Sequence, residues 1–213
     1  MNLRSVLTVA LTLAAPALHA QGADEGTLLI RRGGRDIGSE NYRVTGGDAG
    51  LRITATASYA GSRPPTELSG SVERTAQGSE LAFQLEHRGT AGSQVYAVQK
   101  RNRLTIRRVE RGGEQASEAP GSSSTVLLAD SVFALYLQLV PLASDAGRPV
   151  TAVFPLTGRR ISFTAQRLPT APAGGALIRL AGGLEGELVL GNRGELLRIS
   201  LPALGLEAVR KRE

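Results

Sequence analysis

Short segments in which apolar and polar residues alternate, separated by glycine-rich turns, dominate this chain. In residues 51–60 (LRITATASYA), one face carries Leu51, Ile53, Ala55, Ala57 and Tyr59, and the other carries Arg52, Thr54, Thr56 and Ser58. Strict alternation predicts a β-strand with one buried and one solvated face. The connections between such segments are short, which is typical of antiparallel strands that are neighbours in sequence.

The same reading gives about twelve strands, with no alternation of strands and helices. They are residues 27–32, 37–44, 51–60, 66–75, 80–88, 93–100, 103–110, 150–156, 160–168, 177–181, 184–190 and 195–201. Residues 206–212 are expected to add an edge strand, because their charges discourage further pairing. The polar stretch 111–124 has no period and is expected to be an exposed loop.

One nearly unbroken apolar run, residues 130–142 (DSVFALYLQLVPL), interrupts the strands. Asp130 is suited to cap a helix, and Pro141 ends one because it lacks a backbone donor. The run is apolar on all sides, so it must be enclosed. A helix is favoured, and a buried strand is the alternative.

The sequence therefore predicts a mainly β fold. We expect a strongly curved antiparallel sheet or incomplete barrel, because an open sheet of this size would curl. One central buried helix, at about residues 131–140, is expected to cover its concave face.

The N-terminus has the pattern of a secretory signal peptide. Arg4 precedes an apolar stretch, residues 6–15, that is too short to span a bilayer. Cleavage is expected after Ala20, with Gly22 as the alternative site, and an uncleaved anchor is disfavoured. This leaves a single β-rich domain, residues 21–213, in the periplasm of a bacterium or outside the cell.

The usual catalytic and metal-binding motifs are absent from the sequence. There is no cysteine, and His87 is the only histidine after residue 20, so sites with several histidines are excluded. No nucleophile elbow, dinucleotide loop or phosphate-binding loop is found. We expect no enzyme activity, no cofactor and no metal.

A run of arginines in residues 100–111 forms the most basic part of the chain. On a strand, one face would carry Arg101, Arg103, Arg107 and Arg111, a candidate surface for anionic lipid headgroups or an acidic polymer of the cell envelope. The alternative is an ordinary solvated face balanced by neighbouring glutamates. Nucleic acid is not expected, because the run has no interleaved aromatic residues.

Residues 125–213 show a partial resemblance to known proteins. The expected helix that follows LLAD and the ending ELVLGNRGELLRISLPALGLEAVRK resemble uncharacterised β-rich secreted proteins and domains of bacteria. Their architecture is similar to that of the half-barrel lipoprotein carriers and localisation factors of the periplasm. The resemblance implies a fold and a compartment, and no catalytic residue.

Two functional hypotheses follow. The first is a non-enzymatic binding module that holds an apolar or amphipathic ligand, such as an acyl chain, in its concave face. Its candidate cavity residues are Phe133, Tyr136, Leu137, Val140, Phe83 and His87. The second is a structural or envelope-interaction protein with a filled core. Nothing in the sequence indicates an oligomeric state.

Overall fold

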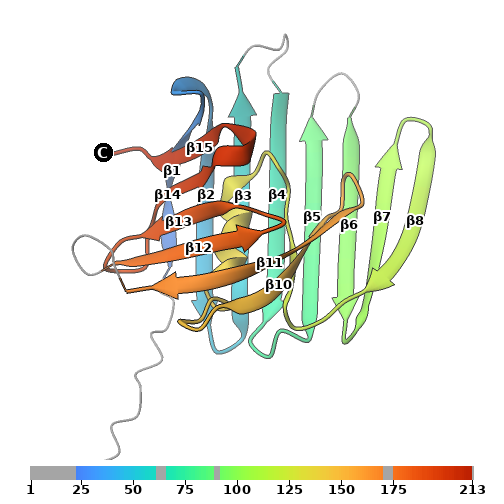
Figure 1. Ribbon diagram of the computed structural model, residues 1–213. Coiled ribbons are helices and arrows are strands. Elements are labelled where there is room, and N and C mark those ends of the chain that lie inside the picture. The colour runs from blue at the N-terminus through green and yellow to red at the C-terminus, as the bar shows by residue number, and fades with distance from the viewer. Residues whose placement is uncertain (1–22, 61–65, 89–91, 170–174, 213) are drawn as a thin grey trace, which may run out of the picture.

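The computed structural model describes residues 23–60, 66–88, 92–169 and 175–212. In this part of the chain, fifteen strands form one sheet in the order β8-β7-β6-β5-β4-β3-β2-β1-β15-β14-β13-β12-β11-β10-β9 (Figure 1). The N-terminal strands are β1 (Asp24–Arg32), β2 (Arg35–Gly47), β3 (Gly50–Tyr59), β4 (Thr66–Thr75), β5 (Glu80–Arg88), β6 (Ser93–Lys100), β7 (Arg103–Glu110) and β8 (Gly113–Pro120). The C-terminal strands are β9 (Thr125–Leu127), β10 (Arg148–Phe154), β11 (Arg159–Leu168), β12 (Ala176–Gly182), β13 (Gly186–Leu190), β14 (Leu196–Leu201) and β15 (Leu206–Arg210).

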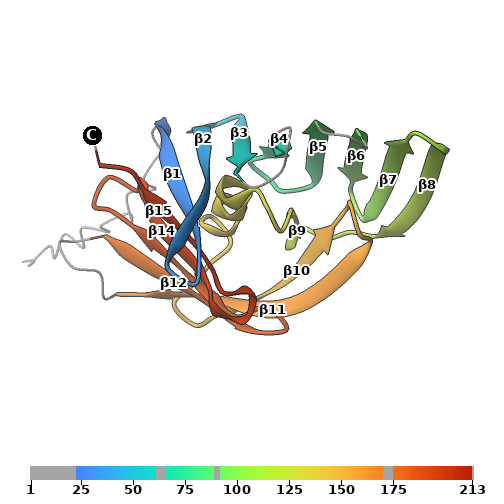
Figure 2. The same cartoon turned by 90° about the horizontal axis from the view of Figure 1, so that it is seen from above.

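The sheet folds back on itself, so that β1–β8 form one wall and β10–β15 the other (Figure 2). Two arginines bridge the walls at their far ends. Arg108 donates to the backbone oxygen of Pro155 at 2.6 Å, and Arg160 donates to that of Pro120 at 2.9 Å. Because β8 and β9 remain the two edges of the sheet, the barrel is incomplete.

The two ends of the described chain meet in the middle of the sheet. β15 lies between β1 and β14, so the expectation that residues 206–212 form an edge strand is wrong. Arg210 bonds Asp24 Oδ1 at 2.9 Å and the hydroxyl of Tyr42 at 2.6 Å. This partly buried cluster links the first two strands to the last.

The expected count of about twelve strands is too low, chiefly because two strands of the middle segment were missed. β8 lies within the polar stretch that was expected to be a loop. It is an edge strand with one neighbour, and nearly all of its residues are exposed, so it has no apolar alternation to reveal it. β9 has only three residues, all buried, and pairs in parallel with β10.

The expected central helix of about ten residues is also not matched. The segment forms a short 3-10 helix, η1 (Phe133–Leu139), and Val140 N donates to Leu137 O at 3.1 Å in the i to i−3 pattern of that helix. A bridge between Ala129 and Val132 precedes η1. The bridge at Val132 and the missing backbone donor of Pro141 therefore bound the helical segment on its two sides.

The core lies between the two walls, and η1 lies inside it against β3 and β4. Every residue of η1 is buried. Gly70 on β4 allows this close approach, because a Cβ atom there would lie 3.3 Å from a methyl group of Val132 and 3.4 Å from one of Leu135. The apolar all-round character of residues 130–142 thus has the predicted consequence, enclosure.

Candidate functional site

Five of the six interior candidates from the sequence lie in a packed core. Phe133 and Tyr136 have exposed fractions of 0%, and Phe83, Leu137 and Val140 are also buried. His87 is half-buried on β5, opposite Leu68 on β4 and Ser93 on β6. None of these six residues lines either of the two surface hollows described below.

The N-terminus of η1 is held by a residue far away in the sequence. Asp130, expected to cap this segment, instead pairs with Arg159 at 2.5 Å. The carboxylate of Glu40 on β2 accepts the backbone N–H groups of Phe133 and Ala134, both at 2.7 Å. Sequence reasoning missed Glu40, although an acid on the inner face of β2 beside Tyr42 and Val44 is a local indication that it has a partner inside.

The polar surroundings of Glu40 come mainly from two tyrosines. The hydroxyl of Tyr59 on β3 donates to the backbone oxygen of Ser131 at 2.8 Å. Burial and the negative charge of Glu40 raise the pKa of Tyr59. Burial also raises the pKa of Tyr42, together with its hydrogen bond to Asp24. Both phenols are therefore neutral at any physiological pH.

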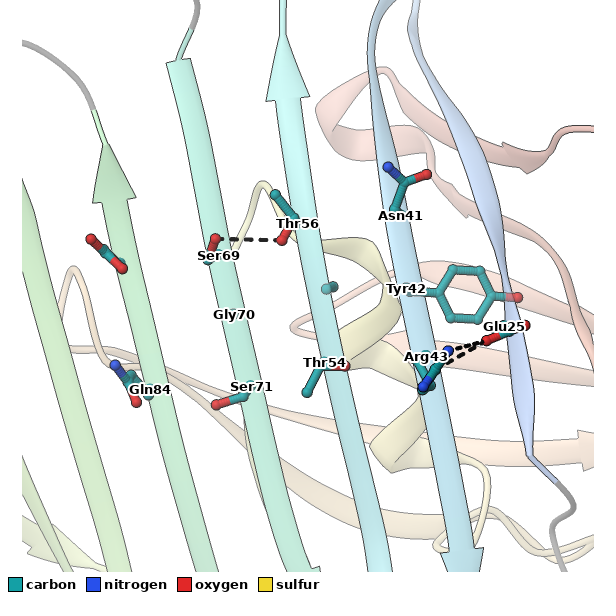
Figure 3. A pocket seen from close by; sticks show the side chains of 12 residues that line it. Glu25, Asn41, Tyr42, Arg43, Thr54, Thr56, Ser69, Gly70, Ser71 and Gln84 are labelled. Carbon is teal, nitrogen blue, oxygen red and sulfur yellow. Dashed lines mark hydrogen bonds and ion pairs between the residues drawn. The ribbon is translucent and has the colours of Figure 1, made fainter.

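A shallow polar hollow of about 480 Å³ lies on the outer face of β2–β5 (Figure 3). Its floor consists of four small hydroxyl side chains on the two central strands, namely Thr54 and Thr56 on β3 and Ser69 and Ser71 on β4. Longer side chains line its sides, namely Asn41 and Arg43 on β2 and Gln84 and Glu86 on β5. We call this hollow the outer trough.

The register of the sheet explains the outer trough. Thr56 is paired with both Asn41 and Ser69, and Ser69 is paired in turn with Glu86. Side chains in one such row point to the same face of the sheet. Two short side chains between two long ones therefore leave a depression in each row.

Some polar groups of the outer trough already interact with one another. Arg43 and Glu25 form an ion pair at 2.7 Å, and the hydroxyl oxygens of Thr56 and Ser69 lie 3.4 Å apart. The two charges at that side therefore largely cancel. The hydroxyl and amide groups of the trough can each donate and accept hydrogen bonds.

A second hollow, of about 610 Å³, lies at the turn end of the same wall. It is more apolar, and its lining includes Ala82 and Val98, of which Val98 is 44% exposed. Arg52 and Glu73 form an ion pair at 3.3 Å along it. The outer face of this wall is thus hollowed in two places.

The arginine candidates are distributed over β7 and its turns. Arg107 pairs with Glu114 on β8 at 2.6 Å, and Arg103 pairs with Glu118. Arg101 lies in the β6–β7 turn with a positive φ of 56°. Arg111 lies in the β7–β8 turn, and no side-chain partner for Arg101 or Arg111 is found among the described residues. Half of this basic face is therefore neutralised by its neighbouring strand.

Within the described ranges, no group of three or more potential metal-ligand side chains is found. Of the helices in the same ranges, none has the length and apolar character needed to cross a membrane.

Comparison with known proteins finds a similar fold but does not identify a family. No family model matches the chain, and no curated protein matches it. A similar solved structure is the crystal structure of the β-barrel-like protein of domain of unknown function DUF1849 from Brucella abortus. The match has a TM-score of 0.59 at 9% sequence identity and covers 91% of this chain and 97% of that one. The chain is thus similar in fold to a β-barrel-like protein.

Proposed function

We propose that this chain is an exported, non-enzymatic module of the bacterial envelope with a filled interior, whose partner binds on the outer face of the sheet. Export rests on the N-terminal pattern in residues 1–20, which lie outside the described residues. The non-enzymatic character rests on the sequence, which has none of the catalytic motifs sought.

The filled interior is the observation that carries the proposal. An acyl chain in the concave face would have to occupy the space taken by Phe133, Tyr136 and the rest of η1. Packed interiors leave few voids larger than a water molecule, so such a ligand could enter only if η1 moved out. This favours the envelope-interaction hypothesis over the acyl-chain hypothesis.

The outer trough is the best candidate for the contact surface. Its floor and sides offer hydroxyl and amide groups, Arg43 is paired with Glu25, and Glu86 is paired with Arg88. Groups that both donate and accept suit a ligand with many hydroxyl groups and little net charge. A glycan strand of the cell wall has this chemistry.

Co-sedimentation of the purified protein with isolated peptidoglycan sacculi tests the proposal. The wild type should sediment with the sacculi, and a double variant with Thr54→Gln and Ser71→Gln should not, because the added side chains fill the outer trough. Ser58→Gln is the matched control. Ser58 lies on the same face of β3, is exposed and does not line the trough.

Two results would contradict the proposal. One is a wild-type protein that stays in the supernatant. The other is equal sedimentation of the wild type and the double variant. Circular dichroism of each variant should first establish that it is folded.

A further inference from the structure

Glu40 is a carboxyl group enclosed in the core at the point where η1 meets the sheet. Its exposed fraction is 0%, and its strand neighbours at this position are Leu28 on β1 and Ala57 on β3. Its two oxygens accept one N–H each, from Phe133 and Ala134. The contact joins residues 93 and 94 positions apart in the sequence.

No cation compensates Glu40 among the described residues, since it takes part in no ion pair there. The titratable groups that face it are Tyr42 on its own strand and Tyr59 on β3, both neutral. The positive charge of Arg32 on β1 acts to lower the pKa of Tyr59, but it does not contribute to the pKa shift of Glu40. On the η1 side, the nearby acid Asp130 is paired with Arg159.

Two effects on this carboxyl group oppose each other. Burial without a cation disfavours the charged form, whereas the two backbone N–H groups favour it. Burial prevails, and it raises the pKa of Glu40 from 4.5 to about 7. If η1 moved away and water reached Glu40, both effects would vanish and the pKa would return toward its ordinary value.

We propose that Glu40 links the docking of η1 to proton uptake, so that η1 is held most firmly in mildly acidic conditions and opens more readily above neutral pH. Docking then binds a proton from solvent on the carboxyl group, and opening releases it. The residue acts as a proton-dependent clamp between β2 and η1.

The direction of this pH effect follows from the difference in the pKa of Glu40 between the closed and the open state. The closed state has the higher pKa, so between about pH 4.5 and pH 7 it binds more protons than the open state. A rise in pH through this range therefore shifts the equilibrium toward opening. Between pH 5 and pH 8 the opening constant should rise by roughly ten- to a hundred-fold.

Hydrogen exchange of the Phe133 and Ala134 amides, corrected for the pH dependence of the chemical exchange step, measures this opening. In the wild type, the protection of both amides should fall by that factor between pH 5 and pH 8. In Glu40→Gln, which cannot titrate, protection should not depend on pH. Glu86→Gln on the outer face of β5 is the control and should behave like the wild type.

A direct titration keeps the proposal testable if Glu40→Gln does not fold. The carboxyl carbon of Glu40 in the wild-type protein, followed by NMR, should titrate with a midpoint near 7. A midpoint at or below about 4.5, the ordinary value, would overturn the proposal. Equal pH dependence of amide protection in the wild type and Glu40→Gln would overturn it as well.

Discussion

The side-chain amide of Gln138 bonds both backbone groups of Leu127. Leu127 N donates to Gln138 Oε1 at 3.3 Å, and Gln138 Nε2 donates to Leu127 O at 2.7 Å. Leu127 lies on the edge strand β9, so the amide takes the place of a missing neighbouring strand. Arg74 supports the same edge by donating to the backbone oxygens of Thr125, at 2.7 Å, and Ser123.

Replacement of Gln138 should lower the free energy of unfolding, because Gln138 satisfies the backbone groups of the buried edge strand β9. Gln138→Leu has a similar size but leaves the N–H and C=O of Leu127 without partners. We expect a loss of about 1–3 kcal/mol in the free energy of unfolding for each unsatisfied group. Chemical denaturation measures it, and Gln84→Leu on the exposed face of β5 is the control, expected within about 0.5 kcal/mol of the wild type.

The packing of η1 makes a second prediction. Leu135→Ala or Leu139→Ala should lower the free energy of unfolding by about 2–5 kcal/mol, the usual cost of a large-to-small change in a core. Leu204→Ala, at a residue that is 40% exposed, should change it by less than about 0.5 kcal/mol. Thermal melts in which Leu135→Ala resembles Leu204→Ala would show that η1 is not part of the core.

A third prediction concerns the binding of anionic surfaces by the arginine face, which consists of Arg101, Arg103, Arg107 and Arg111. Because Arg103 and Arg107 are paired with glutamates on β8, the wild type should bind acidic lipid vesicles weakly or not at all. The double variant Glu114→Gln and Glu118→Gln should bind them. That binding should weaken with salt, as the Debye length falls from about 10 Å at 0.1 M to about 3 Å at 1 M.

Vesicle flotation measures this binding. Strong wild-type binding that disappears when Arg103 and Arg107 are both replaced by glutamine would contradict the interpretation. It would instead support the arginine face as a contact for the anionic envelope.

The sequence predicted the strands best where alternation and turn residues agree. Strands β4, β5, β6 and β7 have the expected bounds, 66–75, 80–88, 93–100 and 103–110. In each, one face meets the core and the other meets solvent, so the pattern is clear. β8 lacks this contrast because almost all of its side chains are exposed.

In residues 130–142, the local sequence pattern could not predict contacts with residues far away in the chain. Its apolar character correctly predicted enclosure, but its cap comes from Glu40 in β2 and not from Asp130 nearby. A contact between residues 93 positions apart depends on how the whole sheet curves.

The sequence predicted only part of the outer trough. The alternation in residues 51–60 already placed Thr54 and Thr56 on the solvated face. The alignment of Ser69 and Ser71 beside them, with long side chains on both sides, is set by the register of four strands. Register is a property of the paired sheet, so the hollow emerges only from the structure.

The interior of this protein is filled by its own side chains. Native mass spectrometry of the protein purified from the organism that produces it measures this, with lipid extraction of the same sample as a second readout. We expect a single mass, that of the polypeptide alone, and an extract free of lipid in molar amounts. A lipid bound at one molecule per chain, and lost in a variant in which Gly70→Val alters the packing beside η1, would contradict it.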